Sequence, residues 1–465
     1  MSNLWGGRFE HDMADVVAEF NASIGFDKRL YDCDIDGSIA HAAMLGETGI
    51  ITPGEADRII GALEEIRRDI ADGHITFSVR QEDIHMAVEE ELTARIGETG
   101  KKLHTARSRN DQVQVDVRLF FMRETKAILE ELIRLQSALL EKASENREEL
   151  IVGFTHMQHA QPVTVGFHLM AYFQMFRRDI ERLIDTRRRA DKNPLGSGAL
   201  SGTAYPIDRD MTTRLLGFGA PTENAMDAVS DRDYIIEFLA AAAISMMHVS
   251  RVAEEFVYWN SSEFKFIAID DAFCTGSSMM PQKKNPDIAE LLRGKTGRVY
   301  GGLVALLTVM KGTPMSFNKD FQEDKEPLFD AVDTWKASIK ILREMIMKTR
   351  YRRGEIDKHL ATGFMSATDF ADALTRQGIP FRESHNIVGR VVKLCESRGC
   401  DFKDLKKDDL LAIDPRFERM SIPDLSMRGL VNARTSFGGT APSEVERQIK
   451  TGRVWLEGIK RGQEA

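Results

Sequence analysis

Long stretches of the chain lack glycine and proline and repeat apolar residues every three or four positions. Four such stretches span residues 101–152, 167–191, 222–275 and 328–353. In the first, one helical face carries Val113, Val117, Phe120, Ile128, Leu132, Leu135 and Leu139. This spacing predicts long α-helices. Residues 287–310 contain four glycines but keep helical apolar spacing, so we expect a fifth long helix there.

Five long helices predict a mainly α protein built around a helical bundle. We place this bundle at residues 107–353, between an N-terminal helical domain at 1–106 and a small C-terminal helical domain at 354–465. Strand signals are few. The best is the segment ITFSV at residues 75–79, where we expect a short strand.

One helix within residues 222–275 is apolar on nearly every face. Its segment IIEFLAAAAISMMHVSRVAEEFV spans residues 235–257. A helix of this kind must be surrounded by other helices, and a single five-helix bundle leaves little room for that. We infer that bundles from several chains pack together, with the small residues 240–243 allowing close approach. A central helix in a large monomer would explain the same pattern.

Composition and charge exclude several classes of protein. The chain has 465 residues, 42% of them hydrophobic, and a formal net charge of −9, which makes it a poor nucleic-acid binder by bulk charge. The N-terminus has no basic cluster followed by an apolar run. The longest apolar stretch, near residues 239–249, is shorter than the roughly 20 residues that cross a bilayer. We therefore expect a cytoplasmic protein with neither membrane nor nucleic-acid partners.

The sequence also predicts no cofactor and no metal. GKT at residues 294–296 ends like a phosphate-binding loop, but Ala289 replaces the required first glycine. The glycines in PLGSGALSG miss the dinucleotide-binding spacing. The eleven histidines form no ligand cluster along the chain. Cys395 and Cys400 flank the expected helix stop Gly399, and two free thiols explain them best.

The densest polar segment is GSSMMPQKKNP at residues 276–286. A surface loop between helices would account for its glycine and prolines, but less well for its cluster of hydroxyl, amine and amide groups. The glycine before Ser277 lets backbone N–H groups approach an anion, while Lys283 and Asn285 add a positive charge and an amide donor. Such a loop suits the stabilisation of a developing oxyanion.

A second polar segment, GFTHMQHAQPVTVGFH at residues 153–168, follows the first long helix and contains His156 and His159. A lone histidine is more often structural, but the neighbouring threonine and glutamines favour a role in moving protons.

A third segment, LHTARSRNDQVQVDVRL at residues 103–119, opens the first long helix. Helix capping explains Asn110 or Asp111. It does not explain Arg107 and Arg109, whose forked guanidinium groups suit carboxylate binding. A fourth segment, FNKDFQEDKEP at residues 317–327, would in isolation be a solvated charge run.

Taken together, these segments resemble a known family. GSSMMPQKKNP resembles the signature of the fumarase/aspartase superfamily, and the flanking motifs narrow the resemblance to the argininosuccinate lyase family. These motifs are LWGGRF (4–9), FNASI (20–24), EDIHMAVE (82–89), HTARSRNDQV, FTHMQHAQPV, PLGSGALSGTAYPIDR, SDRDY, NKDFQEDKEP and FMSATDFADALTRQGIPFRESH (364–385).

The resemblance implies a three-domain, mainly α subunit that forms a homotetramer with a twenty-helix core. Each active site is then composed of motifs from three chains. The implied reaction is the reversible, cofactor-free elimination of argininosuccinate to L-arginine and fumarate, catalysed by a carbon–nitrogen (amidine) lyase at the last step of arginine biosynthesis. The alternatives are another fumarate-releasing lyase of the superfamily and a catalytically silent, crystallin-like structural protein.

The resemblance also implies roles for individual residues. Ser277 would take the Cβ proton as the base, and Lys283 and Asn285 would hold the carboxylate where charge builds. His156 would protonate the leaving nitrogen, and Glu290 would orient His156. The implied substrate-binding positions, those of Asp83, His85 and Arg232 being less well defined, are Ser23, Asp83, His85, Arg109, Asn110, Thr155, Asn285, Arg232, Gln322 and Lys325.

Phe317 departs from the family pattern, in which a tyrosine is expected. Losing one hydroxyl contact costs about 0.5–1.5 kcal/mol, so substrate binding should be weaker than in a tyrosine-containing enzyme, with activity retained. We predict that Phe317→Tyr lowers the KM for argininosuccinate by about two- to tenfold. Steady-state kinetics of the variant beside the parent measure this, and an unchanged KM contradicts it.

Overall fold

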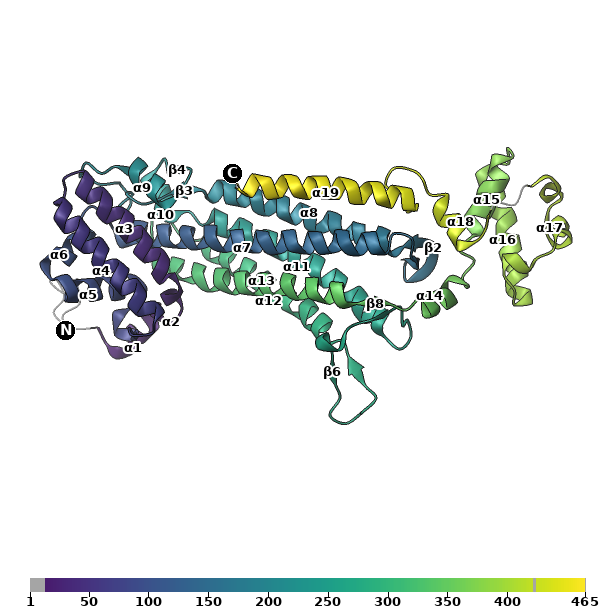
Figure 1. Cartoon of the computed structure of the whole chain (residues 1–465), viewed down its shortest axis with the longest axis horizontal. Coiled ribbons are helices and arrows are strands. Elements are labelled where there is room, and N and C mark those ends of the chain that lie inside the picture. The colour runs from purple at the N-terminus through teal and green to yellow at the C-terminus, as the bar shows by residue number, and fades with distance from the viewer. Residues whose placement is uncertain (1–12, 421–423, 465) are drawn as a thin grey trace. The chain divides into compact units, whose positions relative to one another are not determined.

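The computed structural model describes residues 13–420 and 424–464, and this part of the chain is mainly α-helical, as predicted (Figure 1). The segment LWGGRF at residues 4–9 lies outside the described residues. The five expected long helices are present: α7 (Arg109–Glu145), α8 (Val165–Ala190), α11 (Asp233–Asn260), α12 (Asp287–Met310) and α13 (Lys325–Lys348). The stretches without glycine and proline therefore predicted four of these helices correctly, and α12 was predicted from its apolar spacing alone.

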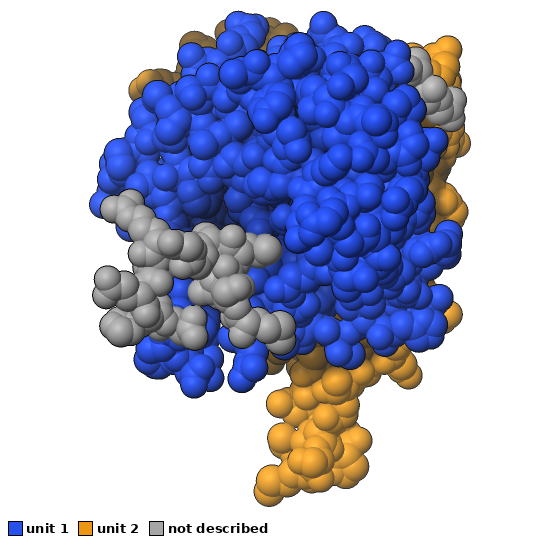
Figure 2. All heavy atoms as spheres, turned by 90° about the vertical axis from the view of Figure 1, so that its left-hand side faces the viewer, with its two compact units in different colours: residues 1–130, 181–244, 297–336 blue, residues 131–180, 245–296, 337–465 orange. Residues whose placement is uncertain are grey.

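The chain divides into two compact units, coloured blue and orange in Figure 2. Unit 1 comprises residues 1–130, 181–244 and 297–336, and unit 2 comprises residues 131–180, 245–296 and 337–465. Each point where the chain passes from one unit to the other falls inside one of the five long helices. The division into three domains stays a prediction.

In unit 1, three helices near the N-terminus pack in sequence, α3 (Tyr31–Glu47) on α4 (Pro53–Ala71) and α4 on α5 (Ile84–Ile96). The Thr52 hydroxyl caps α4 by accepting the N–H of Glu55, whose carboxylate accepts the N–H of Thr52 in return. The expected strand at 75–79 is wrong: residues 75–78 have no regular structure, and Val79–Gln81 is a 3-10 turn. A β-rich segment with no neighbouring strand has no partner for its hydrogen bonds.

Aromatic side chains fill the core of unit 1. The ring of Phe121 meets those of Tyr234 and Phe238 edge-on, and Phe238 also contacts Trp335, so α7, α11 and α13 share one core. Helix α11 is long and apolar enough to span a membrane, but 61% of its apolar window is buried within the chain. It is therefore a core helix, in agreement with the expectation that other helices surround it.

Unit 2 contains two hairpins that the sequence did not indicate. Strands β1 (Leu150–Thr155) and β2 (Gln158–Thr164) pair antiparallel, with an irregularity between Gly153 and Phe154. The short strands β6 (Thr275–Gly276) and β7 (Lys284–Asn285) also pair antiparallel, and their hairpin extends away from the helices (Figure 1). Polar loops of the predicted bundle are thus organised as hairpins at these two positions.

The C-terminal part of unit 2 has its own small core, in which α15 (Ala367–Arg376) packs on α16 (Phe381–Arg398). Helix α16 ends at Gly399, which has a left-handed backbone, and Cys395 and Cys400 are free thiols, as predicted. The remaining helices are α1 (Asp15–Asn21), α2 (Ile24–Asp27), α6 (Glu98–Lys101), α9 (Arg209–Leu216), α10 (Ala225–Ser230), α14 (Arg353–Leu360), α17 (Lys407–Ile413), α18 (Met427–Asn432) and α19 (Pro442–Glu464), and the remaining strands are β3 (Lys192–Asn193), β4 (Ala220–Pro221), β5 (Ile267–Ala268) and β8 (Arg350–Tyr351).

Candidate active site

Ser277 lies in the loop between β6 and β7, and two backbone amides point at its hydroxyl. The N–H groups of Met279 and Met280 donate to Ser277 Oγ at 3.2 and 3.0 Å. Donors of this kind stabilise negative charge on an oxygen, because they bring positive ends of dipoles to it without reorganisation. The local geometry therefore suits an oxygen that becomes an alkoxide.

The two lysines of this hairpin have different environments. Lys284 donates to the carbonyl of Ile269 at 3.1 Å and pairs with Asp271, so it belongs to the stem of the hairpin. Lys283 is exposed, and within the described residues its ammonium makes no hydrogen bond or ion pair. Thr275, at the base of the hairpin, donates its N–H and hydroxyl to Asp287 at 3.1 and 2.5 Å, which ties the hairpin to the first turn of α12.

His156 occupies the turn between β1 and β2, beside Thr155. His156 and Met157 have φ values of 53° and 61°, a left-handed conformation that non-glycine residues rarely adopt. Thr155 and His156 are exposed, as is Glu290 near the start of α12. Within the described residues, no hydrogen bond joins Glu290 to His156. A single chain thus presents these side chains outward without forming the expected pair.

In unit 1, three of the predicted motifs interlock around Asp27. The hydroxyl of Ser23 donates to one carboxylate oxygen of Asp27 at 2.5 Å, and the N–H of Ile84 donates to the other at 3.1 Å. The Gln322 amide donates to the carbonyl of Asn21 at 3.3 Å. These hydrogen bonds therefore bring together three of the predicted motifs: FNASI, EDIH and the QEDK part of the fourth segment. Sequence reasoning missed Asp27, for which its spacing of four residues from Ser23 was the available signal.

Arg109 is the first residue of α7 and faces the start of α5. Its guanidinium lies 3.5 Å from Asp83 and 3.9 Å from Glu89. Asp83 also caps α5 by accepting the N–H of Met86 at 2.7 Å. The capping residue of α7 is Ser108, not Asn110 or Asp111 as expected: its carbonyl accepts the first helical hydrogen bond, and its N–H donates to Asp111.

Asp111 is fully buried and organises the PLGSGALSG segment. Besides the N–H of Ser108, it accepts those of Gly196 and Gly198 at 3.0 and 2.8 Å. Gly198 has φ of 60°, and a Cβ there would lie 2.7 Å from a backbone oxygen of Gly202. The adjacent Asn110 amide donates to the carbonyl of Ala199 at 2.9 Å. The segment rejected as a nucleotide-binding loop thus supports two residues of the third motif.

Arg232 and Lys325 are buried around one carboxylate. Arg232 Nε and Lys325 Nζ each lie 2.8 Å from an oxygen of Asp324, and the Arg232 guanidinium stacks 4.1 Å from the ring centre of Phe321. Burial opposes ionisation of Asp324, but the two cations outweigh it and lower the pKa of that carboxyl. Phe317 is half-buried and packs edge-on against Phe321. Arg232 thus faces Asp324 and not solvent.

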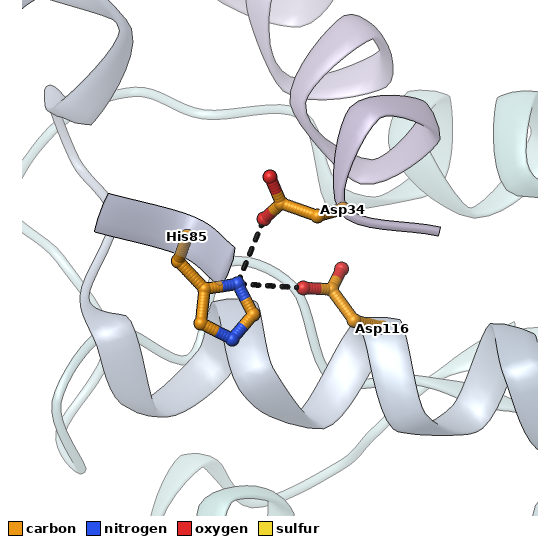
Figure 3. A group of neighbouring side chains, drawn as sticks. All are labelled: Asp34, His85 and Asp116. Atoms are coloured by element: carbon orange, nitrogen blue, oxygen red, sulfur yellow. Dashed lines mark hydrogen bonds and ion pairs between the residues drawn. The ribbon is translucent and has the colours of Figure 1, made fainter. Parts of the chain in front are cut away.

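His85 is also buried, between two carboxylates (Figure 3). Its Nδ1 lies 2.8 Å from Asp34 and 3.1 Å from Asp116, and Gln112 donates to Asp34 at 2.6 Å. Burial alone would lower the pKa of His85, but the hydrogen bonds to Asp116 and Asp34 raise it to about 10. Burial and the charge of Asp34 raise the pKa of Asp116 to about 8. We interpret the cluster as an imidazolium paired with the carboxylate of Asp34, beside an Asp116 that keeps its proton at neutral pH.

No spacing along the chain indicates this cluster, because its members come from α3, α5 and α7. One ligand atom of each side chain lies within 4.8 Å of the others, close enough in principle to share a cation. Burial opposes ionisation of Asp34, but the hydrogen bond and charge of His85, together with the Arg107 guanidinium, lower the pKa of that carboxyl and supply positive charge beside it. Together with the hydrogen-bond distances, this favours a proton over a metal ion.

Comparisons with known proteins identify the family of the chain. The family described as "Lyase" matches residues 7–301, and the "Argininosuccinate lyase C-terminal" family matches residues 364–432. The fold and motifs therefore define a lyase of the fumarase/aspartase superfamily. An argininosuccinate lyase of Moorella thermoacetica is 52% identical over 99% of both chains. One of Pseudomonas putida is 52% identical over 97% of both chains.

The chain belongs to the argininosuccinate lyase family. Among solved structures, EDDS lyase in complex with formate superposes with a TM-score of 0.82 at 27% identity, over 94% of this chain and 89% of that one. The shared architecture supports the helical bundle described above.

The buried imidazolium predicts a stability that falls as pH rises. The folded chain holds the His85 proton up to about pH 10, whereas an unfolded imidazole releases it near 6.5, so this contribution is complete below 6.5 and is lost towards 10. Folding also raises the pKa of Asp116, from 3.8 to about 8, so its contribution to stability is likewise lost as pH rises. In urea titrations, the free energy of unfolding of the parent should fall with rising pH more steeply than that of His85→Gln, by up to about 1.4 kcal/mol per pH unit, which is the contribution of one titrating group.

The matched control for this measurement is His74→Gln, which changes an exposed histidine of unit 1 and should keep the parent's dependence. An equally steep decline in His85→Gln and the parent contradicts the assignment.

Proposed function

We propose that this chain catalyses the reversible elimination of argininosuccinate to L-arginine and fumarate. The observation that carries the proposal is the 52% identity over 99% of both chains with an argininosuccinate lyase. We further propose a cytoplasmic location and a place at the last step of arginine biosynthesis, with no cofactor and no nucleic-acid or membrane partner. Incubation with argininosuccinate, adenylosuccinate, aspartate or malate, followed by fumarate absorbance, tests the substrate. Formation of fumarate from adenylosuccinate, aspartate or malate but not from argininosuccinate contradicts the proposed substrate.

The chemical difficulty is a C–H bond next to a carboxylate, which is a very weak acid. In the proposed mechanism, Ser277 Oγ removes the Cβ proton as an alkoxide. The N–H groups of Met279 and Met280 at 3.2 and 3.0 Å support that charge. Removal of the proton leaves an aci-carboxylate dianion. Lys283 and Asn285 hold it, and this binding is stronger in the transition state than in the ground state, as catalysis requires.

Collapse of the dianion breaks the carbon–nitrogen bond. The electron pair of that bond goes to the guanidino nitrogen, which His156 protonates, directly or through a water, with Glu290 orienting the imidazole. The carbon skeleton leaves as fumarate. Histidine suits the donor role because its ordinary pKa is near neutral pH.

The residues of unit 1 form the binding part of the proposed site. Arg109 offers a forked guanidinium to a substrate carboxylate, and Lys325 offers an ammonium. Ser23, Asn110 and Gln322 supply neutral hydrogen-bonding groups, as Thr155 does from unit 2. Unlike the exposed hairpin groups, all five of the unit 1 residues are buried or half-buried, so their geometry is largely set before substrate arrives.

We propose a homotetramer with a twenty-helix core and active sites composed of segments from different subunits. Support comes from α12, which buries one stripe of apolar residues within the chain and exposes another formed by Tyr300, Val304 and Leu307. An apolar face of this extent needs a partner. The exposure of Lys283 and His156 also fits this proposal, because elimination through a dianion requires a site closed to bulk water.

The base assignment predicts a specific kinetic defect. Ser277→Ala should lower kcat by about a thousandfold or more, because it removes the oxygen proposed as the base, while leaving the substrate Kd and the tetramer mass unchanged. Stopped assays and calorimetry measure the two quantities. The neighbouring Ser278→Ala, in the same hairpin, serves as control and should change kcat by less than about threefold. Near-parental turnover of Ser277→Ala contradicts the assignment.

Composite sites predict complementation between inactive variants. Ser277→Ala and Arg109→Ala damage different segments, so dissociation and reassembly of a mixture should produce some sites with both residues intact and recover part of the activity. A mixture of Ser277→Ala and Lys283→Ala, which alter the same hairpin, should recover none. Equal recovery in both mixtures, or none in either, is inconsistent with sites shared between chains.

A further inference from the structure

We propose that His85 is a positioning residue: held between Asp34 and Asp116, it fixes the first turn of α5 so that Asp83 faces Arg109. This inference rests on the proposed function and deepens it, because it assigns to a buried side chain the alignment of the substrate-binding part of the site.

His85 cannot itself touch substrate. It is 1% exposed, Asp34 is 1% exposed and Asp116 is fully buried. Figure 3 shows the ring edge of His85 turned towards both carboxylates, which come from α3 and α7. The Nδ1 atom forms a hydrogen bond with Asp34 at 2.8 Å and lies within ion-pair distance of Asp116 at 3.1 Å, so one ring nitrogen contacts side chains from two other helices.

Both ends of this link lie next to residues that the site needs. His85 is the second residue of α5, directly after Ile84 and two positions after the capping residue Asp83. Asp116 lies seven residues after Arg109 on α7, which places both on one face two turns apart. The cluster therefore fixes α5 and α7 close to the point where Asp83 and Arg109 approach to 3.5 Å.

A second route leads from the same turn to the serine of the FNASI motif. The N–H of Ile84 donates to Asp27 at 3.1 Å, and Asp27 accepts the Ser23 hydroxyl at 2.5 Å. A rotation of the first turn of α5 would move this N–H away from Asp27. Ser23 would then lose its orientation together with Asp83.

Charge explains why a histidine is suited to this place. The ionisable groups that face it are Asp34 and Asp116 from the neighbouring helices, Asp83 on its own helix cap, Asp27, and Arg107 beside the carboxylates. Acidic groups surround this ring, and a protonated ring compensates the buried charge of the Asp34 carboxylate. Glutamine keeps a hydrogen-bonding group of similar reach but carries no charge. It therefore tests the imidazolium and not merely the volume.

The experiment compares His85→Gln, Asp116→Asn and the exposed control His74→Gln with the parent tetramer. We expect the KM for argininosuccinate to rise about tenfold or more in His85→Gln, and by a smaller factor in Asp116→Asn, while kcat stays within about threefold. The reason is that the base and its donors lie in the other unit. A merely structural role would reduce the amount of folded enzyme and leave KM at the parental value, and that result overturns the proposal. If His85→Gln does not fold, Asp116→Asn decides alone.

A crystal structure of His85→Gln, or of Asp116→Asn if the first does not fold, separates this proposal from the proposed function, because it needs no substrate. Separation of Asp83 and Arg109 beyond about 4 Å is expected. Retention of the 3.5 Å approach overturns the positioning role even where the parent cleaves argininosuccinate. Conversely, if the parent forms no fumarate from argininosuccinate, the proposed function is wrong, but this structural test still applies.

Metal analysis of the parent is the last measurement. A stoichiometric divalent cation would overturn the role of the imidazolium.

Discussion

Buried carboxylates that must be neutralised where they stand determine how unit 1 is assembled. Asp34 and Asp116 meet an imidazolium, Asp111 meets three backbone N–H groups, and Asp324 meets a guanidinium and an ammonium. An unpaired buried charge costs several kcal/mol, so each of these contacts permits only a narrow range of helix positions. Apolar packing alone tolerates small shifts between helices far better than such contacts do.

The contacts of Asp111, Asp116 and His85 gather at the first two turns of α7 and at the start of α5. Substrate-binding candidates stand directly beside them: Arg109 and Asn110 precede Asp111, and Asp83 precedes His85. The architecture therefore separates two tasks. Buried acids and their partners hold the backbone, and the adjacent half-buried side chains remain available to a ligand. Arg232 likewise has a structural contact beside a binding candidate, because it donates a hydrogen bond to Asp324, which also pairs with Lys325.

The catalytic candidates of unit 2 are built on a different principle. Ser277 and His156 lie in hairpin turns whose stems are tied to the helices, while the turns themselves are largely exposed. Backbone geometry does the local work: two N–H groups meet the Ser277 oxygen, and left-handed conformations shape the His156 turn. Within one chain these turns are open to solvent, and α12 also exposes apolar side chains.

The periodicity of apolar residues determined the five long helices, because each helix buries a stripe that recurs at its own pitch and needs no knowledge of partners. Motif residues such as Ser277, Lys283 and Arg109 were also visible, since their chemistry is unusual for a surface loop. The strand at 75–79 was wrong because strand formation depends on a partner. Only the tertiary structure decided that His85 stands between Asp34 and Asp116, that Asp27 joins Ser23 to α5, and that α12 exposes Tyr300, Val304 and Leu307. Such contacts join residues far apart along the chain, and no local pattern records which distant charge or surface will be the neighbour.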